Sequence, residues 1–348
     1  MSNPGGVRRW LVSLAVCAGV LTGCETSTDA GEDPAPATPS ATPSATPSAT
    51  PSPQASSPGP PTRDETASPS PVPRADRAPA VPARFRRDRA MATIRWLAGE
   101  VGPREGSSAA FRRAARRVAR RFSGLGYDVR RQSFAVPEGN SWGVPVPAGR
   151  STNVIATPEG FRSGRPHLLV GAHLDTVPQA PGAEDNASGV AVLLELARMA
   201  ASDGTRLPVV FVAFGAEEPR GDGDALHHFG STAYVNRMSP RERRGLQAMV
   251  SLDRVGVGTV VPVCTGGLSP LRVRAMLVRG AGEIDVPVST CSDNASSDHW
   301  SFEKAGEPVA RIGSTPYAGY HSAQDVPAVV NPAQLGRVGR VMWDWMTR

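Results

Sequence analysis

Long apolar runs are scarce in this sequence, and the one near the amino terminus is too short to span a bilayer comfortably as a mature helix. Cysteine is also scarce, with four among 348 residues. No HExxH stretch occurs, which argues against single-zinc peptidases that carry both histidines on one helix. The serine of "GSTAYV" does not fit a nucleophile elbow, so serine hydrolysis is not supported. The chemistry must therefore come from residues dispersed along the chain.

The amino terminus has the order of an export signal. Arg8 and Arg9 precede the apolar stretch 10–20, and small residues lead to Cys24 in "LTGC". This order resembles the lipobox of bacterial lipoproteins, whose cysteine becomes the first mature residue and carries the lipid. An ordinary secretory signal with a chance cysteine is the alternative. We expect residues 1–23 to be a lipoprotein signal peptide, and the exported chain to be anchored through Cys24 to the outer face of the cell membrane or released from it.

A low-complexity region follows the predicted signal peptide. It contains "ATPSATPSATPSATPSP" and then more Pro, Ser and Ala, with no apolar period, so it cannot bury a core. We expect residues 24–84 to be a disordered tether, stiffened by proline, that holds a domain away from the membrane. The remainder, 85–348, is long enough for one well-packed domain.

Two cysteines are left for that domain. Cys17 is removed with the signal and Cys24 is lipidated, which leaves Cys264 and Cys291. An extracellular location and an even number of cysteines favour a disulfide between them. Two reduced core cysteines are the alternative.

The formal net charge is +6, and part of it falls in one predicted helix that begins after Ser107. Its apolar residues follow a 4-3-4-3 spacing that gives one buried stripe: Phe111, Ala115, Val118, Phe122 and Leu125. The arginines between them fall away from that stripe. Because an exported protein meets little nucleic acid, we expect a solvated basic face and no nucleic-acid partner, with attraction to an anionic envelope as a middle option.

Apolar runs alternate with helical patterns through the rest of the domain. "YDVRRQSFAV" and "STNVIATPEG" are typical of strands, and "PHLLVGAHLDTV", "LPVVFVAFGAEE" and "LQAMVSLDRVG" are near-continuous apolar runs expected of buried strands. "NASGVAVLLELARMAASDG" has the pattern of a helix. This alternation predicts an α/β fold with a largely parallel sheet.

Polar side chains stand where these apolar runs end. His173, Glu217, Glu218 and Asp253 each lie at or just beyond the carboxyl end of a predicted buried strand. Ligands of open α/β sheets bind at that edge. Histidine and carboxylate side chains without cysteine suit zinc or a similar divalent ion. The sequence therefore indicates a metal site at this edge of the sheet.

Several stretches together resemble one family, the bacterial secreted di-zinc aminopeptidases, which share a superfamily with glutaminyl cyclases and the transferrin receptor. They cover most of residues 90–345 and read "GPREGSS", "GYDVRRQSF", "NVIAT", "GAHLDTV", "AEDNASGVAVLLELAR", "FVAFGAEE", "GSTAYV", "SLDRVG", "SDHWSFEKAGEPVA" and "YHSAQD". The resemblance implies a three-layer sandwich with a central mixed, mostly parallel sheet flanked by helices. It also implies two Zn²⁺ ions and peptide substrates with a free amino terminus.

The resemblance also implies a metal-ligand set. One zinc would be held by His173, Asp185 and Asp253, and the other by Asp185, Glu218 and His321. Two zinc ions about 3.5–4 Å apart need a carboxylate that bridges them, and Asp185 takes that role. Each ion then has three protein ligands and an open position for water.

Three further residues receive roles in hydrolysis. A hydroxide held at the metals would attack the scissile carbonyl, and Glu217, fixed beside a ligand, is the natural general base. The resemblance implies that Asp175 hydrogen-bonds the ligand His173. The Tyr320 hydroxyl would stabilise the oxyanion, with aromatic packing beside the site as the alternative.

Four other polar residues are not assigned to the metals. His227 and His228 lie in a loop longer than is common in the family, and we interpret them as rim or solvated residues. His299 belongs to a motif that supports the site, and Asp298 beside it is a candidate neighbour of the ligands.

The sequence therefore predicts a monomeric metallo-aminopeptidase that releases N-terminal residues from peptides outside the membrane. Two alternatives use the same fold. A glutaminyl-cyclase-like acyltransferase with one zinc is disfavoured because all five ligands are present. A catalytically silent surface binding protein is disfavoured because the ligands and the base are all retained.

Overall fold

The computed structural model describes residues 84–268 and 270–348. The predicted signal peptide, Cys24 and the tether up to residue 83 lie outside the described residues. Among the residues that are described, no helix combines the length and the apolar character needed to cross a membrane.

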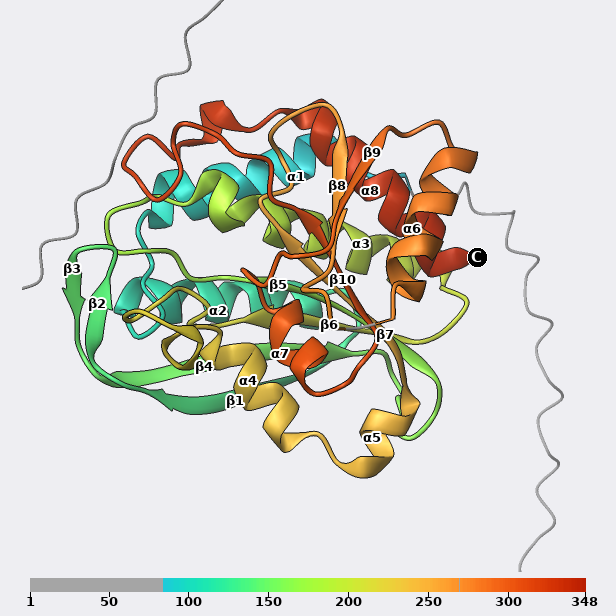
Figure 1. Ribbon diagram of the computed structural model, residues 1–348, viewed down its shortest axis with the longest axis horizontal. Coiled ribbons are helices and arrows are strands. Elements are labelled where there is room, and N and C mark those ends of the chain that lie inside the picture. Colours follow the sequence, from blue (N-terminus) through green and yellow to red (C-terminus); the bar gives the residue numbers. More distant parts are fainter. Residues whose placement is uncertain (1–83, 269) are drawn as a thin grey trace, which may run out of the picture. The chain divides into compact units, whose positions relative to one another are not determined.

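An eight-stranded mixed sheet forms the centre of the domain (Figure 1). Its strands in spatial order are β1 (Asp128–Val136), β4 (Gly149–Thr157), β6 (Val209–Phe214), β5 (His167–His173), β7 (Leu246–Asp253), β10 (Val309–Gly313), β8 (Val261–Cys264) and β9 (Val288–Cys291). The four central strands β6, β5, β7 and β10 run parallel, whereas β1, β4 and β6 pair antiparallel. A separate hairpin pairs β2 (Gly139–Ser141) with β3 (Val144–Val146).

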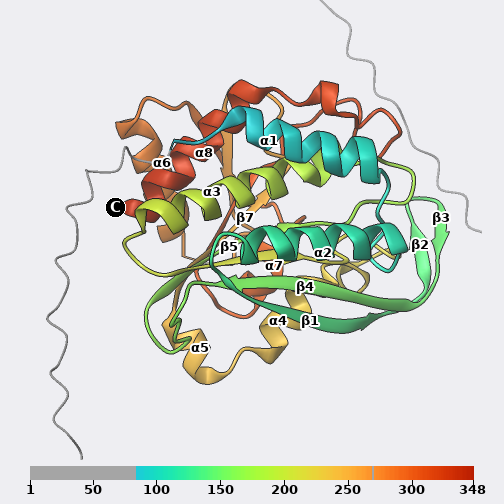
Figure 2. The same ribbon diagram turned by 180° about the vertical axis from the view of Figure 1, so that it is seen from behind.

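Helices cover both faces of the sheet, which confirms the predicted three-layer sandwich (Figures 1 and 2). One face carries α1 (Arg87–Ile94), α2 (Ala109–Ser123), α3 (Gly189–Asp203), α6 (Arg272–Glu283) and α8 (Pro332–Thr347). The other face carries α4 (Phe229–Arg237) and α7 (His299–Lys304), with α5 (Pro240–Gly245) beside them. Short helical turns connect these elements: η1 (Arg95–Val101), η2 (Ala183–Ser188), η3 (Asp224–Leu226) and η4 (Pro327–Val329).

The local sequence explains the central elements. Every residue of β5 and β6 is buried. This agrees with their near-continuous apolar runs, which predicted strands covered on both faces. Helix α2 buries four residues of the predicted apolar stripe, Phe111, Ala115, Val118 and Phe122, and leaves its arginines exposed. Leu125, the fifth, lies beyond the end of the helix and is half-buried. Its first turn is capped by Ser108, whose hydroxyl accepts the Phe111 N–H at 3.0 Å.

The parallel strands bring the predicted site residues to one edge. His173 is the last residue of β5, Asp253 is the last residue of β7, and β6 ends just before the stretch that holds Glu217. Because carboxyl ends of parallel strands meet at the same edge, these side chains converge although they are far apart in the sequence.

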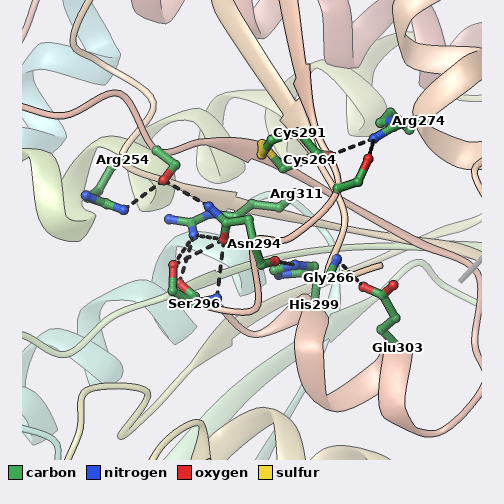
Figure 3. The surroundings of a disulfide bond; sticks show 12 residues. Arg254, Cys264, Gly266, Arg274, Cys291, Asn294, Ser296, His299, Glu303 and Arg311 are labelled. Atoms are coloured by element: carbon green, nitrogen blue, oxygen red, sulfur yellow. Dashed lines mark hydrogen bonds between the residues drawn. A yellow bond between two sulfur atoms is a disulfide. The ribbon is translucent and has the colours of Figure 1, made fainter. Parts of the chain in front are cut away.

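A disulfide joins Cys264 to Cys291 and so connects β8 with β9 at the edge of the sheet (Figure 3). Close to it, Arg311 of β10 donates from Nη1 to the Asn294 side chain at 2.6 Å and to the Ser296 carbonyl at 2.9 Å. These bonds fix the loop after β9 beside the carboxyl edge of the sheet.

Candidate metal centre

The structure brings all five predicted metal ligands into one small cavity. The cavity measures about 60 Å³, and its lining includes His173, Asp185, Glu218, Asp253 and His321. All five residues are buried, with residue exposures between 1% and 8%. A larger cavity of about 520 Å³ lies against the disulfide and is lined by none of these residues.

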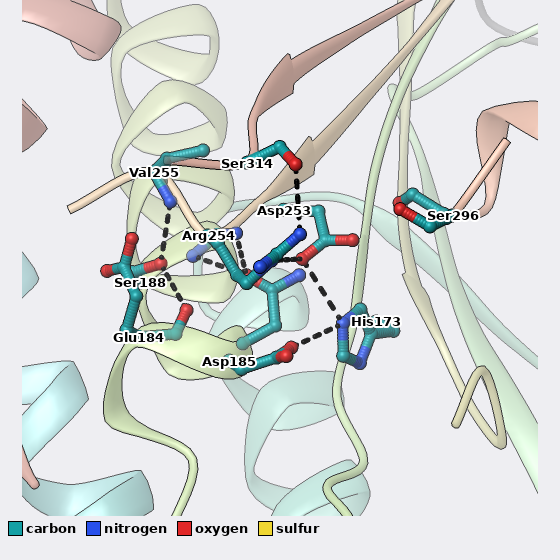
Figure 4. A network of polar contacts seen from close by, with 12 residues as sticks. His173, Glu184, Asp185, Ser188, Asp253, Arg254, Val255, Ser296 and Ser314 are labelled. Carbon is teal, nitrogen blue, oxygen red and sulfur yellow. Dashed lines mark hydrogen bonds and ion pairs between the residues drawn. The ribbon is translucent and has the colours of Figure 1, made fainter. Parts of the chain in front are cut away.

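Asp185 lies between the two histidines. Its Oδ1 is 3.1 Å from His173 Nε2, and its Oδ2 is 3.2 Å from His321 Nε2. Two oxygens of one carboxylate that face two different imidazoles have the arrangement of a bridging ligand. Figure 4 shows Asp185 and Asp253 both facing the same edge of the His173 ring.

The remaining ligands complete the cluster on either side of Asp185. Asp253 Oδ1 is 3.6 Å from His173 Nε2, and Glu218 Oε2 is 3.3 Å from His321 Nε2. Two trios that include His173 have ligand atoms within 4.8 Å of one another, and they divide the residues differently from the predicted sets. One contains His173, Asp185 and Glu218, and the other His173, Glu217 and Asp253.

The donor set fits a cation of the zinc type. Glu218 Oε1 and Asp253 Oδ1 are buried and have no hydrogen-bond partner among the described residues. Burial raises the pKa of Glu218 to about 7, so the negative charge of this carboxylate is costly here without added positive charge. Imidazole nitrogens and carboxylate oxygens are ligands that zinc accepts.

Asp325 orients the turn that carries Asp185. Its carboxylate accepts the backbone N–H groups of Glu184 at 2.8 Å and Asp185 at 3.0 Å, and the Tyr317 hydroxyl donates to it at 2.9 Å. Burial raises the pKa of Asp325 to about 6. We did not predict this residue, although it ends the "YHSAQD" stretch that also contains His321.

Asp175 supports the paired glutamates instead of His173. Its carboxylate oxygens accept the N–H groups of Glu217 and Glu218, each at 3.1 Å. The expected hydrogen bond to the ligand histidine is absent, because His173 Nδ1 lies 3.8 Å from Asp175 Oδ1. The Asp175 carboxylate therefore supports the backbone of the "EE" turn.

Two buried arginines hold other parts of the site. Arg311 Nη2 lies 3.0 Å from Asp253 Oδ2, whereas the other oxygen of that carboxylate faces His173. Arg104 donates to the carbonyls of Leu174, Pro181 and Gly182 and so joins the loop after β5 to the loop before η2. In the sequence, Arg311 is a charged residue within the apolar stretch "VARIG". Arg104 lies in "GPREGSS", one of the stretches that carry the family resemblance.

Glu217 faces the cluster and two further histidines. Its Oε2 lies 4.0 Å from His173 Nε2 and 3.6 Å from His227 Nε2, and its Oε1 lies 3.2 Å from His228 Nε2. The interpretation of His227 and His228 as solvated rim residues is wrong for His228, which is 2% exposed. The loop folds inward because the His228 N–H donates to the Glu217 carbonyl at 2.9 Å.

Aromatic side chains and Arg254 form the rim. The Tyr320 ring stacks on His321 with centroids 3.7 Å apart, and Trp142 from the β2–β3 hairpin packs edge-on against His321 at 4.4 Å. The Arg254 guanidinium lies 4.5 Å from the Tyr320 ring centroid and donates to Ser314 at 2.9 Å. Tyr320 is 37% exposed, so its ring lies at the boundary between the cavity and solvent.

Asp298 and His299 lie at the start of α7 and are fully buried. His299 Nε2 is 2.7 Å from the Asn294 carbonyl, and burial lowers the pKa of this imidazole to about 3. Burial raises the pKa of Asp298. His299 thus supports the loop after β9 and is not placed among the predicted ligands.

An α/β sheet with a cluster of histidine and carboxylate side chains at its carboxyl edge is typical of a metal-binding protein. Residues 153–346 match the model described as Peptidase family M28. The chain therefore belongs to peptidase family M28, a family of hydrolases.

Curated relatives carry peptidase names. Aminopeptidase YwaD of Bacillus subtilis is 33% identical over 200 residues, which cover 54% of this chain and 42% of that protein. The probable lipoprotein aminopeptidase LpqL of Mycobacterium tuberculosis is 34% identical over 105 residues, which cover 30% of this chain and 19% of that protein. The matched region spans less than half the length of either relative.

Solved structures share the fold. The zinc aminopeptidase of Bacillus subtilis superposes with a TM-score of 0.66 at 20% identity, covering 76% of this chain and 95% of that one. Fimbriiglobus ruber glutaminyl cyclase superposes with a TM-score of 0.63 at 23% identity, covering 75% of this chain and 95% of that one. At these identities the likeness defines the architecture of the chain.

Proposed function

We propose that this chain is a zinc-dependent aminopeptidase that removes N-terminal residues from peptides, with His173, Asp185, Glu218, Asp253 and His321 as ligands of two zinc ions. The observation that carries the proposal is the position of Asp185, whose two oxygens lie 3.1 and 3.2 Å from two different imidazoles. Membership of peptidase family M28 and the aminopeptidase names of the curated relatives support it.

Glu217 is the proposed general base. Zinc, when bound, would polarise the scissile carbonyl and lower the pKa of a water molecule. The Glu217 carboxylate would take the proton from that water and later deliver it to the leaving amine. Asp175 fixes the position of this base through the backbone, because it accepts the N–H groups of both residues in the glutamate pair.

The carboxylates of Glu217 and Asp253 would select substrates with a free amino terminus. Glu217 and Asp253 lie in one trio with His173 and present negative charge to the cavity. A substrate ammonium group is a fitting counterion for them, whereas a blocked amino terminus is not. Tyr320, at the boundary with solvent, is proposed to donate its hydroxyl to the developing oxyanion.

The test compares hydrolysis of a panel of aminoacyl chromogenic amides by chelated protein and by protein reloaded with zinc. We expect release only after reloading, and none from amides whose amino group is acetylated. Glutaminyl peptides incubated in parallel separate the alternatives, since a cyclase would convert them to pyroglutamyl products. A zinc-loaded chain that hydrolyses nothing in the panel would refute the proposed activity.

We further propose that Cys24 carries a lipid and anchors the exported chain to the outer face of the cell membrane. The "LTGC" sequence supports this, as does the name of the relative LpqL, a probable lipoprotein aminopeptidase.

A further inference from the structure

A second group of metal-binding side chains lies against the first. Glu217, His227 and His228 each offer one ligand atom, and these atoms lie within 4.8 Å of one another. His228 Nε2 is 3.2 Å from Glu217 Oε1, and His227 Nε2 is 3.6 Å from Glu217 Oε2. The two imidazole rings stack with centroids 3.8 Å apart, and each places its Nε2 toward the Glu217 carboxylate.

The buried imidazole of this group has no hydrogen bond to any described residue. His228 is 2% exposed, and neither ring nitrogen has a hydrogen-bond partner there, although Nε2 lies at ion-pair distance from Glu217 Oε1. Its Nδ1 lies 3.9 Å from Asp224 Oδ1, which is too far for such a bond. Buried polar atoms are seldom left unsatisfied, and an imidazole nitrogen beside a carboxylate and a second imidazole is suited to a cation.

The spacing of the group agrees with zinc coordination. Zinc bound tetrahedrally at about 2.0–2.1 Å places neighbouring ligand atoms about 3.3 Å apart. The two contacts with Glu217, at 3.2 and 3.6 Å, lie on either side of that separation. Two imidazoles and one carboxylate also leave the fourth position for water.

The loop that carries the histidines is fixed and accessible. The Arg220 N–H donates to the Leu226 carbonyl at 2.8 Å, and Asp224 accepts the Trp300 ring N–H at 2.9 Å and pairs with Lys304. The side chain of His227 is 25% exposed and lines the cavity of the predicted ligands. An ion can therefore reach the group from the cavity without displacing the loop.

We propose that Glu217, His227 and His228 form an additional zinc site, and that an ion bound there inhibits hydrolysis by occupying the carboxylate that acts as the base. The inhibitory part rests on the proposed function, whereas binding of the extra ion does not. The site would bind more weakly than the five-ligand centre, because it has one carboxylate in place of three. Free zinc would then set the fraction of active chains.

Binding is tested on the untagged full chain by equilibrium dialysis against buffered zinc, with metal counted by mass spectrometry. We expect the wild type to take up one more ion per chain than H227Q at the highest free zinc. H167Q is the matched control, because it removes an imidazole at the opposite end of β5 and should bind as many ions as the wild type. Equal counts for the wild type and H227Q would overturn the proposal.

H228Q is a second variant that should also bind one ion fewer than the wild type. Because His227 is more exposed than His228, H227Q tests the site even if H228Q does not fold. Cobalt substitution adds a spectroscopic measurement, in which one visible absorption component should be missing from H227Q. Retention of that component in H227Q, with wild-type stoichiometry, also overturns the site.

Steady-state kinetics test whether the additional zinc ion inhibits hydrolysis. Wild-type activity should fall about tenfold when free zinc reaches about ten times the dissociation constant of the extra ion, because the active fraction follows site occupancy. The ratio of activity at low and high zinc should stay near one in H227Q. If neither protein hydrolyses peptides but the count still differs by one ion, the proposed function fails and the site stands. If hydrolysis is normal and the count is equal, the site fails alone.

Discussion

Glu217 and Glu218 are adjacent in sequence and have different partners in space. Glu218 Oε2 lies 3.3 Å from His321, within the cluster of predicted ligands. Glu217 turns toward His173 and the two histidines of the following loop. Because Asp175 accepts both backbone N–H groups, the two side chains are held in these separate directions.

This division predicts opposite effects of two single substitutions. E217Q should lower kcat by about 10²–10⁴-fold, the usual contribution of a positioned general base, and leave the metal content of the five-ligand centre intact. E218Q should lose metal, because it removes the charge of a ligand. Both are checked by steady-state kinetics with metal analysis at limiting zinc. Normal turnover by E217Q would refute its role as the base.

The buried imidazole of His299 should make the stability of the fold depend on pH. Burial lowers its pKa to about 3, whereas an unfolded histidine titrates near about 6.5. Between these values the unfolded chain binds a proton that the folded chain does not, so stability falls as the pH decreases. His299 should contribute about 1.4 kcal/mol per pH unit to this fall.

The measurement is urea unfolding of metal-free wild type and H299Q across this pH window. H299Q is expected to be less stable at pH 7, since a buried partner of the Asn294 carbonyl changes, but its stability should depend less on pH. Identical pH slopes for the two proteins would contradict a buried neutral imidazole.

At the scale of elements, the carboxyl end of β10 is packed against that of β7. Gly313 has a φ of +115°, and a Cβ at this position would lie 1.9 Å from the carbonyl oxygen of Asp253, a proposed zinc ligand. The sheet therefore requires glycine here for both backbone conformation and space.

G313A should push Asp253 out of position and weaken zinc binding by about 10–100-fold, as expected when the support of a ligand is disturbed. G306A is the matched control, because Gly306 also has a positive φ, +79°, but has nothing within 4 Å of its Cβ position. Zinc titration with a competing chelator measures both. Equal zinc affinity in the two variants would show that backbone strain alone accounts for any loss.

The strands could be predicted from sequence where the pattern is local. The runs that became β5, β6 and β7 are apolar throughout, so their position and the polar residues at their ends followed directly. The β2–β3 hairpin, which carries Trp142 to the site, was missed because its strands are three residues each and contain Gly, Asn and Pro. The predicted helix near Asn186 begins as the η2 turn, with α3 proper starting at Gly189.

The supporting residues could not be predicted because their partners are distant in sequence. Asp325 bonds residues 140 and 141 positions away, and His228 was interpreted from an apparently solvent-exposed loop. Arg311 was visible only as a charge inside an apolar strand. Such contacts depend on tertiary packing, which no local pattern in the sequence encodes.

At the scale of the whole molecule, the proposed anchor determines where the enzyme works. C24A should abolish incorporation of labelled palmitate and move the protein from the detergent phase to the aqueous phase in Triton X-114 partition. C17A is the control, since Cys17 lies within the proposed signal peptide and should leave labelling unchanged. Continued labelling of C24A would contradict the lipobox interpretation.

The contacts between Asp185 and the loop after β10 have a consequence for biogenesis. Asp325 positions the turn of Asp185, and His321 faces its Oδ2, yet both residues follow β10, the last strand among the described residues. A growing chain that has completed β5 to β7 still lacks one histidine and the support of the central aspartate. With the proposed ligand set, the zinc centre is complete only after the whole sheet has been synthesised, so we expect a chain that is exported unfolded to acquire zinc after translocation.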